Sequence, residues 1–324
     1  MKEKNKLVSV IIPCYNCSLT IGKTLDSLER QSYSSVEIIL INDGSEDETE
    51  KVIIGYLKRN KLNIRYFSKE NEGVSIARNI GIEKSLGEYI LFLDADDVYH
   101  FDFIRCMCDT VDSQNLDTAY SLWSRDVDFI LSQNKIIMNK CVNKVNQKDM
   151  MKEFLYNKGK IGFCSFIYRK SIINKYSIKF TPYRKTGEDI EFTWKYLCHC
   201  VNGAVVNSQI YGYYNNPSSV VNSVFWERTD SLKSIISIEE YLKAYECEFY
   251  GEFKKYMYSR AIWSYAKTFA RGKRKDLFNR LIMEYDVIYH MKNMWKNAAD
   301  WKVRLSSLLY CIHPKLFYFI VSLM

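Results

Sequence analysis

The sequence of 324 residues contains only 4 prolines, no low-complexity segment and no repeat of the length that builds solenoids. These absences argue against a disordered chain and against a proline-rich linker. The hydrophobic fraction of 47% and the charged fraction of 26% are those of an ordinary folded protein. The length leaves room for one large domain or two smaller ones.

The sequence also shows no pattern typical of a targeting segment, so we expect none. The first six residues are charged and lead directly into an apolar stretch, which argues against a secretory signal. No uninterrupted apolar run is long enough to span a bilayer, and the apolar stretch 305–324 is broken by His313, Pro314 and Lys315. We therefore expect a cytoplasmic protein.

The ten cysteines form no recognisable metal site. Cys14 and Cys17 are spaced C-x-x-C in a predicted loop, but no second pair accompanies them, as a zinc site would require. Cys198 and Cys200 lie in a helical pattern, where their side chains point in different directions. We expect reduced, mostly buried thiols rather than a metal or redox centre.

Buried strands alternate with helices over the first 95 or so residues, which predicts a parallel sheet wound in the Rossmann manner. The first strand-to-helix turn has neither G-x-G-x-x-G nor the phosphate-binding loop pattern, which argues against a nicotinamide oxidoreductase and an ATPase. The predicted strands are Leu7–Pro13, Val36–Ile41, Ile64–Phe67 and Tyr89–Leu93. The predicted helices are Ser18–Gln31 with Ser18 as N-cap, Asp47–Arg59, and Gly73–Leu86 with Ile76, Ala77 and Ile80 facing inward.

The pattern changes in the middle of the chain and becomes helical from about Phe225 to the end. Strands are predicted at Thr118–Trp123, Val127–Leu131, Lys135–Cys141 and Phe163–Tyr168, and extended segments at Ala204–Val206 and Gln209–Tyr214. Helices are predicted at Asn146–Tyr156 and Thr186–Leu197, with a short one after Arg169-Lys170.

Three carboxylates, Asp94, Asp96 and Asp97, follow the strand at Tyr89–Leu93. In an open α/β sheet the carboxyl ends of the strands form the ligand site. Clustered carboxylates without His or Cys favour a hard divalent cation, usually shared with a phosphate. The alternative is an acidic turn that caps the next helix.

Two further residues are candidates for the same edge of the sheet. Asp43 ends the strand at Val36–Ile41, which we expect to neighbour the acidic strand, and it can accept from a base N–H or from ribose hydroxyls. Its alternative is an Asx turn with Gly44. Arg78 can reach phosphate oxygens as a planar donor fork, but on its own it is better explained as a surface arginine.

Glu188 and Asp189 open a predicted helix. Negative charge is favoured at a helix N-terminus, so simple capping explains them. The functional alternative is a general base presented to a substrate hydroxyl across a cleft.

Taken in order, five motifs resemble glycosyltransferase family 2, enzymes of the GT-A fold. The motifs are Val8-Ser-Val-Ile-Ile-Pro-Cys-Tyr-Asn16, Ile41-Asn-Asp-Gly-Ser45, Asn71-Glu-Gly-Val-Ser-Ile-Ala-Arg-Asn79, Gly87–Asp97 and Gly187-Glu-Asp189. The resemblance covers residues 7 to about 200. It implies a GT-A domain over 1–222, with a nucleotide-binding half at 1–97 and an acceptor half at 98–222. A helical region at 223–324 follows.

The resemblance implies an inverting glycosyltransferase that uses a nucleotide sugar, usually a uridine diphosphate sugar. Asp94-Ala95-Asp96 matches the family's D-x-D motif, which implies Asp96 as the more direct ligand of Mn²⁺ or Mg²⁺ and Asp94 nearer the ribose or a metal-bound water. Asp97 helps to orient the site. Asp189 matches the catalytic base, supported by Glu188. The positions that match the nucleotide-sugar site are Pro13, Tyr15, Asn16, Asp43, Arg78, Asp94, Ala95 and Asp96.

The acceptor side is less well defined. By analogy it is lined by Phe163–Tyr183, whose Phe166, Tyr168 and Tyr183 either stack on sugars or pack in the core. Many relatives carry Arg and His in the segment that matches Tyr211–Ser219, where this chain has Asn215 and Asn216. A histidine metal ligand from that segment is therefore not expected.

The last part of the chain is basic: Gly251–Met324 carries 14 Lys or Arg against 5 Asp or Glu, a net charge of +9. Trp301, Leu305, Leu308 and Ile312 fall on one helical face among basic residues. Either this helix lies on an anionic membrane, near a lipid-linked acceptor at the inner face of the cell membrane, or it packs on the domain. Nucleic acid is not expected, because no nucleic-acid motif accompanies the charge.

Two other functions fit the same features less well. A nucleotidyltransferase would be expected to carry a loop rich in Gly, Lys and Arg after the first strand, and Cys14–Ser18 is not such a loop. A non-catalytic sugar-nucleotide-binding protein would not need Asp94, Asp96 and Asp189 together.

Overall fold

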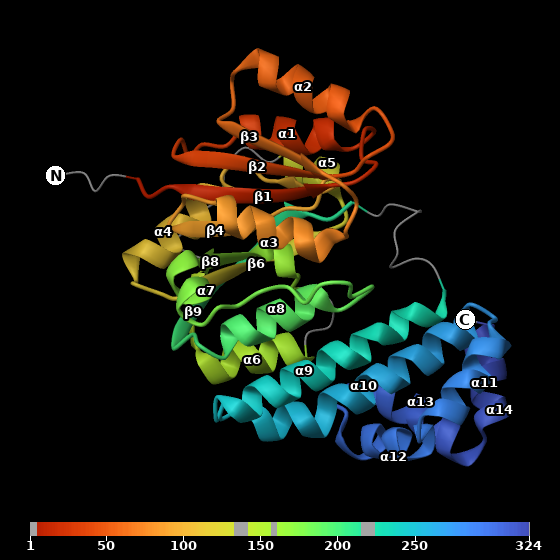
Figure 1. Cartoon of the computed structure of the whole chain (residues 1–324). Coiled ribbons are helices and arrows are strands. Elements are labelled where there is room, and N and C mark those ends of the chain that lie inside the picture. The colour runs from red at the N-terminus through yellow and green to blue at the C-terminus, as the bar shows by residue number, and fades with distance from the viewer. Residues whose placement is uncertain (1–4, 133–141, 157–160, 215–223, 324) are drawn as a thin grey trace. The chain divides into compact units, whose positions relative to one another are not determined.

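The structure, a computed structural model, describes residues 5–132, 142–156, 161–214 and 224–323 (Figure 1). It divides into two compact units, each considered separately below. The first comprises Met1–Tyr183 with Phe192–Asn216, and the second comprises Arg184–Glu191 with Pro217–Met324. The predicted strand Lys135–Cys141, as well as Asn215 and Asn216, lies outside the described residues.

Strands and helices alternate through the first unit, as the sequence predicts. The elements are β1 (Val8–Cys14), α1 (Ile21–Glu29), β2 (Val36–Asp43), α2 (Thr49–Arg59), β3 (Ile64–Lys69), α3 (Val74–Lys84), β4 (Tyr89–Phe92), β5 (Val98–Tyr99), α4 (Phe103–Ser113), β6 (Thr118–Ser124), α5 (Val127–Ser132), β7 (Val142–Asn146), α6 (Gln147–Tyr156), the 3₁₀ turn η2 (Phe163–Ser165), β8 (Phe166–Arg169), α7 (Lys170–Lys175) and β9 (Asn202–Gly212). Helix α8 (Glu188–Leu197) starts in the second unit and ends in the first.

The described strands form one sheet in the order β3-β2-β1-β4-β8-β6-β9-β5, with β7 paired to β9. β3, β2, β1 and β4 are parallel to one another, so the predicted Rossmann-like winding holds for the first half of the unit. Beyond β4 the pairing is mixed, because β8 runs antiparallel to both β4 and β6. The predicted α/β class is confirmed. β1 lies between β2 and β4, so the expectation that the strands of Asp43 and Asp94 are direct neighbours was wrong.

Helix α3 packs closely on β1 and β2. A Cβ atom added at Gly81 would lie 2.3 Å from Cγ2 of Ile11, so only glycine permits this approach. The helix therefore buries its small side chains, Ala77 among them. The prediction that Ile76 and Ile80 face inward was wrong: both are only half-buried, because the close face of the helix has no room for them.

Helix α5 replaces the strand that was predicted at Val127–Leu131. Asp126 accepts a hydrogen bond from the backbone N–H of Phe129 at 2.8 Å and so caps the start of a helix. Val127 and Ile130, three residues apart, face the core. The short apolar run had been assigned to a strand because its length does not distinguish the two structures.

Three smaller corrections concern the ends of elements. The N-cap of α1 is Thr20 rather than Ser18, whose N–H donates instead to Oδ2 of Asp47 at 3.1 Å. The strand predicted at Phe163–Tyr168 starts as a 3₁₀ turn and becomes extended only from Phe166. The two extended segments predicted near residue 206 are one strand, β9.

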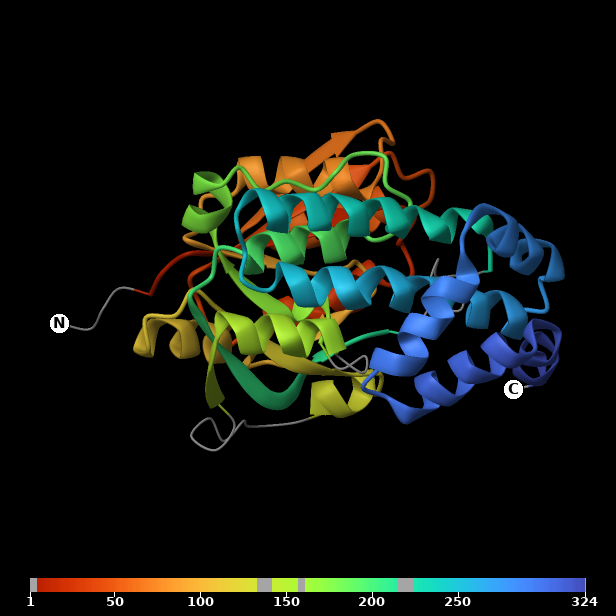
Figure 2. The same ribbon diagram turned by 90° about the horizontal axis from the view of Figure 1, so that it is seen from below.

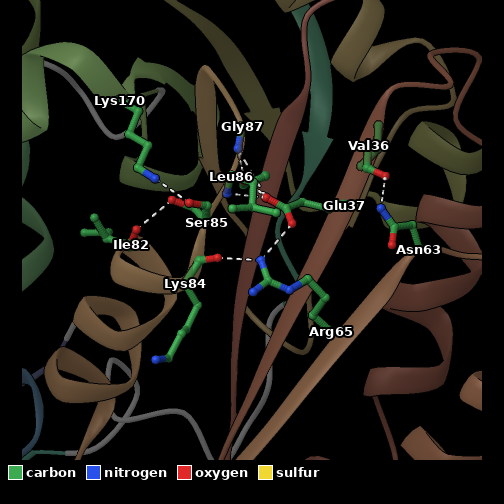
Figure 3. Close-up of polar contacts among 11 residues, drawn as sticks. Val36, Glu37, Asn63, Arg65, Ile82, Lys84, Ser85, Leu86, Gly87 and Lys170 are labelled. Carbon is green, nitrogen blue, oxygen red and sulfur yellow. Dashed lines mark hydrogen bonds and ion pairs between the residues drawn. The ribbon is translucent and has the colours of Figure 1, made fainter.

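A buried carboxylate ties β4 to the parallel strands (Figure 3). Oε1 of Glu37, on β2, accepts hydrogen bonds from Oγ of Ser9 at 2.5 Å, from N of Leu86 at 2.6 Å and from N of Gly87 at 3.2 Å. Oε2 of the same carboxylate pairs with Nη1 of Arg65, on β3, at 3.1 Å. The turn that leads into β4 is thereby held by three strands.

Gly87 is required in that turn by the closeness of β1. A Cβ atom at this position would lie 2.6 Å from Oγ of Ser9 and 2.8 Å from the backbone oxygen of Leu7. Gly87 therefore marks a close approach of the backbone to β1.

Replacing Glu37 with glutamine is expected to lower the free energy of unfolding by about 2 kcal/mol at pH 7. Burial alone would raise the pKa of Glu37, but the bonds from Ser9, Leu86 and Arg65 outweigh burial and lower it. The carboxylate therefore stabilises the fold fully above its unfolded pKa of about 4.3. This stabilisation is lost as the pH falls through the lower folded pKa. Denaturant unfolding at pH 7 and at about pH 3 measures both effects.

The matched control is Glu83→Gln, because Glu83 lies on the exposed side of α3 with 73% of its side chain accessible. This variant should unfold like the wild type at both pH values. The role given to the Glu37 carboxylate would be contradicted if the difference in free energy of unfolding between Glu37→Gln and the wild type were as large in acid as at pH 7.

The second unit is helical, as predicted from about Phe225 onward. Its elements after the start of α8 are the 3₁₀ turn η4 (Trp226–Asp230), α9 (Ser231–Ala244), α10 (Tyr250–Arg271), α11 (Lys275–Glu284), α12 (Val287–Asn297), α13 (Trp301–Ile312) and α14 (Pro314–Ser322). Helix α10 is central to the unit, since it packs against α9, α11, α12 and α14. Figure 2 shows α9 and α10 side by side. Within the described residues, no helix combines the length and the apolar character needed to cross a membrane.

Candidate active site at the carboxyl edge of the sheet

The acidic turn directly follows β4. The N–H of Leu93 still donates to O of Ile11 at 3.0 Å, so the pairing with β1 continues to the last residue before the acids. Asp97 N then donates to O of Asp94 at 3.1 Å and closes the turn, while Oγ1 of Thr24 donates to O of Ala95 at 3.1 Å. The carboxylates are thus fixed at the carboxyl edge of the parallel strands, where α/β sheets bind their ligands.

Arg78 is buried and pairs with the first of these acids. Its Nη2 lies 2.9 Å from Oδ1 of Asp94, and its side chain is 5% exposed. The guanidinium also lies over two aromatic rings, 4.9 Å from the centroid of Phe163 and 5.4 Å from that of Phe180. The assignment of Arg78 as a surface residue was therefore wrong. α3 holds its charge beside the acidic turn.

Asp97 joins the acidic turn to the end of β9. Its carboxylate is fully buried and accepts hydrogen bonds from the hydroxyl of Tyr211 and, at 2.8 Å, from the backbone N–H of Tyr214. Burial, together with the charges of Asp94 and Asp96, raises the pKa of Asp97 well above its ordinary value. Asp97 thus fixes the acidic turn to the end of β9.

Asp94 and Asp96 are both half-buried. No group of three or more His, Cys, Asp or Glu side chains within the described ranges is arranged to hold a metal ion alone. Mg²⁺ and its close analogues are commonly held by one or two carboxylates together with substrate phosphates. Two accessible carboxylates beside a cationic guanidinium fit such a shared site, in which a diphosphate completes the coordination.

The loop after β1 is fastened to the loop after β2. The N–H of Asn16 donates to Oγ of Ser45 at 3.0 Å, and Oδ1 of Asn16 accepts from N of Glu46 at 2.9 Å. Asn16 has a positive φ of 47°, a conformation that asparagine tolerates well. The ring of Tyr15 beside it is 51% exposed. The segment that includes Pro13 therefore offers an exposed aromatic ring on a backbone that is held in place.

Asp43 is buried, and its carboxylate has three partners in the folded chain. Oδ1 accepts from Nζ of Lys69 at 2.5 Å and from N of Glu72 at 3.0 Å, and Oδ2 accepts from N of Gly73 at 2.8 Å. The side-chain bond that closes the turn after β2 comes from Asn42 rather than Asp43, since Oδ1 of Asn42 accepts from N of Ser45 at 3.0 Å. Asp43 thus orders the entry to α3, the helix that carries Arg78.

Lys69 is a residue of this edge that the sequence analysis did not predict. It ends β3 in register with Asp43, so it belongs to the same edge of the sheet. Its pKa is raised: burial acts against the charged form, but the hydrogen bonds to Asp43 and Glu72 outweigh it. The signal that predicts Asp43, a polar residue at the end of a buried strand, would have found Lys69 as well.

Glu188 and Asp189 lie in the second unit, in the first turn of α8. Gly187 precedes them with a φ of +87°, and its O accepts from N of Glu191 at 3.0 Å. Glu191, one turn along, is buried and accepts from Oγ of Ser237 at 2.7 Å. The helix start is thus anchored by Glu191, and both predicted catalytic acids remain half-buried.

The predicted acceptor aromatics separate into two kinds. Phe166 and Tyr168 are buried in the core of the first unit, where Tyr168 contacts Phe92 and Phe192 through edge-to-face rings. The interpretation that these two rings stack on a sugar is therefore wrong, because both are buried in the hydrophobic core. Tyr183 is 77% exposed and remains available.

The fold and the acidic edge of the sheet are those of a known class of enzyme, and a comparison with family models supports the same class. The family model for glycosyl transferase family 2 matches residues 9–177, more than half of the chain. The chain therefore belongs to glycosyl transferase family 2, as the resemblance predicted.

Two curated relatives are similar over a comparable length. The uncharacterized glycosyltransferase EpsJ of Bacillus subtilis (strain 168) is 29% identical over 222 residues, which cover 66% of this chain and 62% of the relative. The uncharacterized glycosyltransferase YibD of Escherichia coli (strain K12) is 29% identical over 224 residues, which cover 68% and 64%. The match thus spans less than two thirds of the length of either relative.

Two solved structures have a similar fold. Staphylococcus aureus TarS 1–349 in complex with UDP has a TM-score of 0.62 at 19% identity, over 98% of this chain and 90% of that chain. The mannosyltransferase PcManGT from Pyrobaculum calidifontis, in complex with GDP-Man and Mn²⁺, has a TM-score of 0.56 at 12% identity, over 99% and 86%. At these identities the likeness shows the fold, and the predicted GT-A fold is confirmed.

Replacing Arg78 with lysine is expected to lower the free energy of unfolding by about 2 kcal/mol, because an ammonium group cannot pair with Asp94 and lie over Phe163 and Phe180 at once. The control is Arg59→Lys, since Arg59 is exposed and lies over a single ring, that of Tyr56. Chemical denaturation should show little change for the control. Equal effects of the two variants would contradict a special environment for Arg78.

Proposed function

We propose that the protein is an inverting glycosyltransferase. It moves a sugar from a nucleotide sugar to a hydroxyl group of a saccharide acceptor in a single displacement, without a covalent enzyme intermediate. The observation that carries the proposal is the pairing of the buried Arg78 with Asp94 at the carboxyl edge of the sheet, beside the accessible Asp96. Cationic and acidic groups side by side suit a diphosphate and its counter-cation.

The donor is proposed to be a uridine diphosphate sugar, bound along the carboxyl edge of the parallel strands. TarS has been crystallised with UDP and with UDP-GlcNAc, whereas PcManGT has been crystallised with GDP-Man. Pro13, Tyr15 and Asn16 would contact the nucleoside. Asp43 is buried against Lys69, so we propose that it shapes the nucleoside site and accepts from base or ribose at its edge.

Asp96 and Asp94 are the residues that would hold Mn²⁺ or Mg²⁺, with Ala95 between them in the turn. When bound, such a cation stabilises negative charge on the departing diphosphate. Arg78, which is held over two rings, adds a fixed positive charge to the same region. Asp97 keeps the turn attached to β9.

Asp189 is proposed as the general base and Glu188 as its support. A carboxylate in the first helical turn is stabilised in its ionised form by the free N–H groups, which keeps it ready to accept a proton. Removal of the acceptor's proton lets the hydroxyl oxygen attack the anomeric carbon on the side opposite the diphosphate. The C–O bond to the diphosphate breaks as the new one forms, so the configuration inverts and an α-linked donor gives a β-linked product.

We further propose that the acceptor is a lipid-linked oligosaccharide of a capsule, O-antigen or other surface polysaccharide. The enzyme would then work in the cytoplasm, at an anionic membrane surface. The division of labour is part of the same proposal: donor binding in 1–97, acceptor binding in 98–222 and membrane contact in 223–324. A nucleotidyltransferase or a non-catalytic sugar-nucleotide-binding protein is the alternative.

A panel of nucleotide sugars tests the proposal. Purified protein should be stabilised against heat by one UDP-sugar in the presence of Mn²⁺ or Mg²⁺, and should release UDP from it on adding a saccharide acceptor. Removing the metal with a chelator should abolish both responses. Release of pyrophosphate from a sugar phosphate and a nucleoside triphosphate would support a nucleotidyltransferase instead, and binding without any turnover would support the non-catalytic alternative.

A further inference from the structure

Helices α13 and α14 of the second unit pack against each other. Each helix carries apolar side chains on its buried side and on its exposed side. The inward positions of α13 are Val303, Ser307 and Tyr310, and those of α14 are Phe317 and Val321. These residues complete the core of the unit. The packing of the domain is therefore satisfied without the apolar residues on the outer side.

The outer side of the two helices carries large apolar groups. On α13, Trp301 is 63% exposed, Leu305 is 56% exposed and Ile312 is 72% exposed. On α14, Phe319 is 60% exposed, and Leu316, Ile320 and Leu323 are exposed too. The spacings of four and seven residues on α13, and of three and four on α14, place each set on one side of its helix. Together they form what we call the outer face.

The outer face is built on well-defined helices. Asp300 caps α13 by accepting from N of Lys302 at 2.8 Å. His313 caps α14 by accepting from N of Leu316 at 3.1 Å, and Pro314 occupies the first turn. The start of each helix is therefore fixed by a side-chain cap, which indicates that the exposed apolar groups belong to folded helices.

Positive charge surrounds the outer face. Lys302, Arg304 and Lys315 are exposed on the same two helices, and the chain contains no Asp or Glu after Asp300. Nζ of Lys302 lies 5.8 Å from the ring centroid of Trp301. Tryptophan beside basic residues, with aliphatic residues between them, is the composition of helices that lie in the interface of an anionic bilayer.

We propose that the outer face of α13 and α14 rests on an anionic lipid surface, with Leu305 and Phe319 in the acyl boundary and Lys302 and Arg304 among the lipid phosphates. A second copy of the chain fits this face less well, because a two-fold contact would bring the same basic residues together without a compensating acid. The inference deepens the membrane contact of the proposed function by assigning it to particular residues.

Vesicle flotation with the whole chain tests this assignment. The wild type should float with vesicles of phosphatidylcholine and phosphatidylglycerol and not with phosphatidylcholine alone. Leu305→Glu/Phe319→Glu should lose at least about tenfold in the vesicle-bound fraction, since two charges would enter the apolar boundary. Lys302→Glu/Arg304→Glu should also lose about tenfold in the vesicle-bound fraction. Added salt should weaken the binding of this variant less than it weakens the binding of the wild type.

Matched controls occur in the same unit. Ile236 and Tyr245, at α9, are 45% and 47% exposed, so Ile236→Glu/Tyr245→Glu makes the same chemical change elsewhere. Lys273→Glu/Lys275→Glu makes the same change of charge at the start of α11, where both residues are exposed. Both controls should float like the wild type, and circular dichroism should show all variants folded.

Three results would overturn the assignment: a wild type that stays soluble beside anionic vesicles, controls that lose as much binding as the outer-face variants, or outer-face variants that bind normally. Sedimentation without lipid supplies a fourth. A wild-type dimer that Leu305→Glu/Phe319→Glu dissociates would assign the face to a second copy. The assay contains no nucleotide sugar, so its failure would leave the transferase proposal untouched.

Discussion

Replacing Asp96 with alanine is expected to reduce sugar transfer roughly a thousandfold while leaving the fold intact. Asp96 is half-buried at the carboxyl edge of the sheet. The bond from N of Asp97 to O of Asp94 and the bond from Oγ1 of Thr24 to O of Ala95 use no atom of the Asp96 side chain, so both remain when its carboxylate is removed. Its loss should therefore act on the bound cation and the leaving diphosphate. Initial rates with the donor identified by the nucleotide-sugar panel measure the effect.

Binding separates this effect from simple misfolding. In calorimetric titrations the wild type should bind UDP more tightly when Mn²⁺ is present, and Asp96→Ala should bind UDP about equally with and without the metal. Asp128→Ala is the control, because Asp128 lies on α5 with a side chain that is 91% exposed. Normal transfer by Asp96→Ala would remove Asp96 from the site.

Local patterns were sufficient to predict the parallel half of the fold. Buried strands of four to eight residues, each followed by an amphipathic helix, specify a right-handed β-α-β winding with few alternatives. The carboxyl ends of such strands share one edge, so the acids after β4 were assigned to a site from the sequence alone. That this edge carries Asp43 and Lys69 follows from the same rule.

Features that depend on contacts between distant parts of the chain could not be predicted from the sequence. Taken on its own, Arg78 was better explained as a surface residue, and only the family resemblance placed it in the site. Its neighbours on α3 do not reveal that its guanidinium lies over Phe163 and Phe180, far along the chain. The strand order has the same origin: β1 lies between β2 and β4 because the chain reverses its winding direction after β3, and no local signal marks that reversal.

The mixed half of the sheet, beyond β4, was harder to predict for a different physical reason. Its elements are short, and a run such as Val127–Leu131 satisfies both strand and helix patterns until Asp126 is recognised as a cap. Buried aromatic residues are equally ambiguous, since a ring that can stack on a sugar can also fill a core. Phe166 and Tyr168 do the latter. The roles given to Asp94, Asp96 and Asp189 stay predictions until variants are measured.

Replacing Asp189 with asparagine is expected to lower kcat by roughly a thousandfold, with little change in the affinity for the nucleotide sugar. Asparagine keeps the shape of the side chain, and its amide oxygen can still accept from N of Ile190, which lies 2.7 Å from Oδ1 of Asp189 in the folded chain. What it loses is the ability to take a proton. The variant should therefore bind UDP-sugar normally and fail only in transfer.

The same variant tells a base from a binding residue. If Asp189 accepts the acceptor's proton, the wild-type rate should fall at low pH as the carboxylate is protonated, and the residual rate of Asp189→Asn should lack that dependence. Glu188→Gln is the control at the neighbouring position. Because Glu188 is proposed only to support the base, this variant should lower kcat by less than about a hundredfold. Equal losses in both variants, or a normal rate for Asp189→Asn, would assign the proton transfer to another group and leave the donor site at Asp94 and Asp96 as it stands.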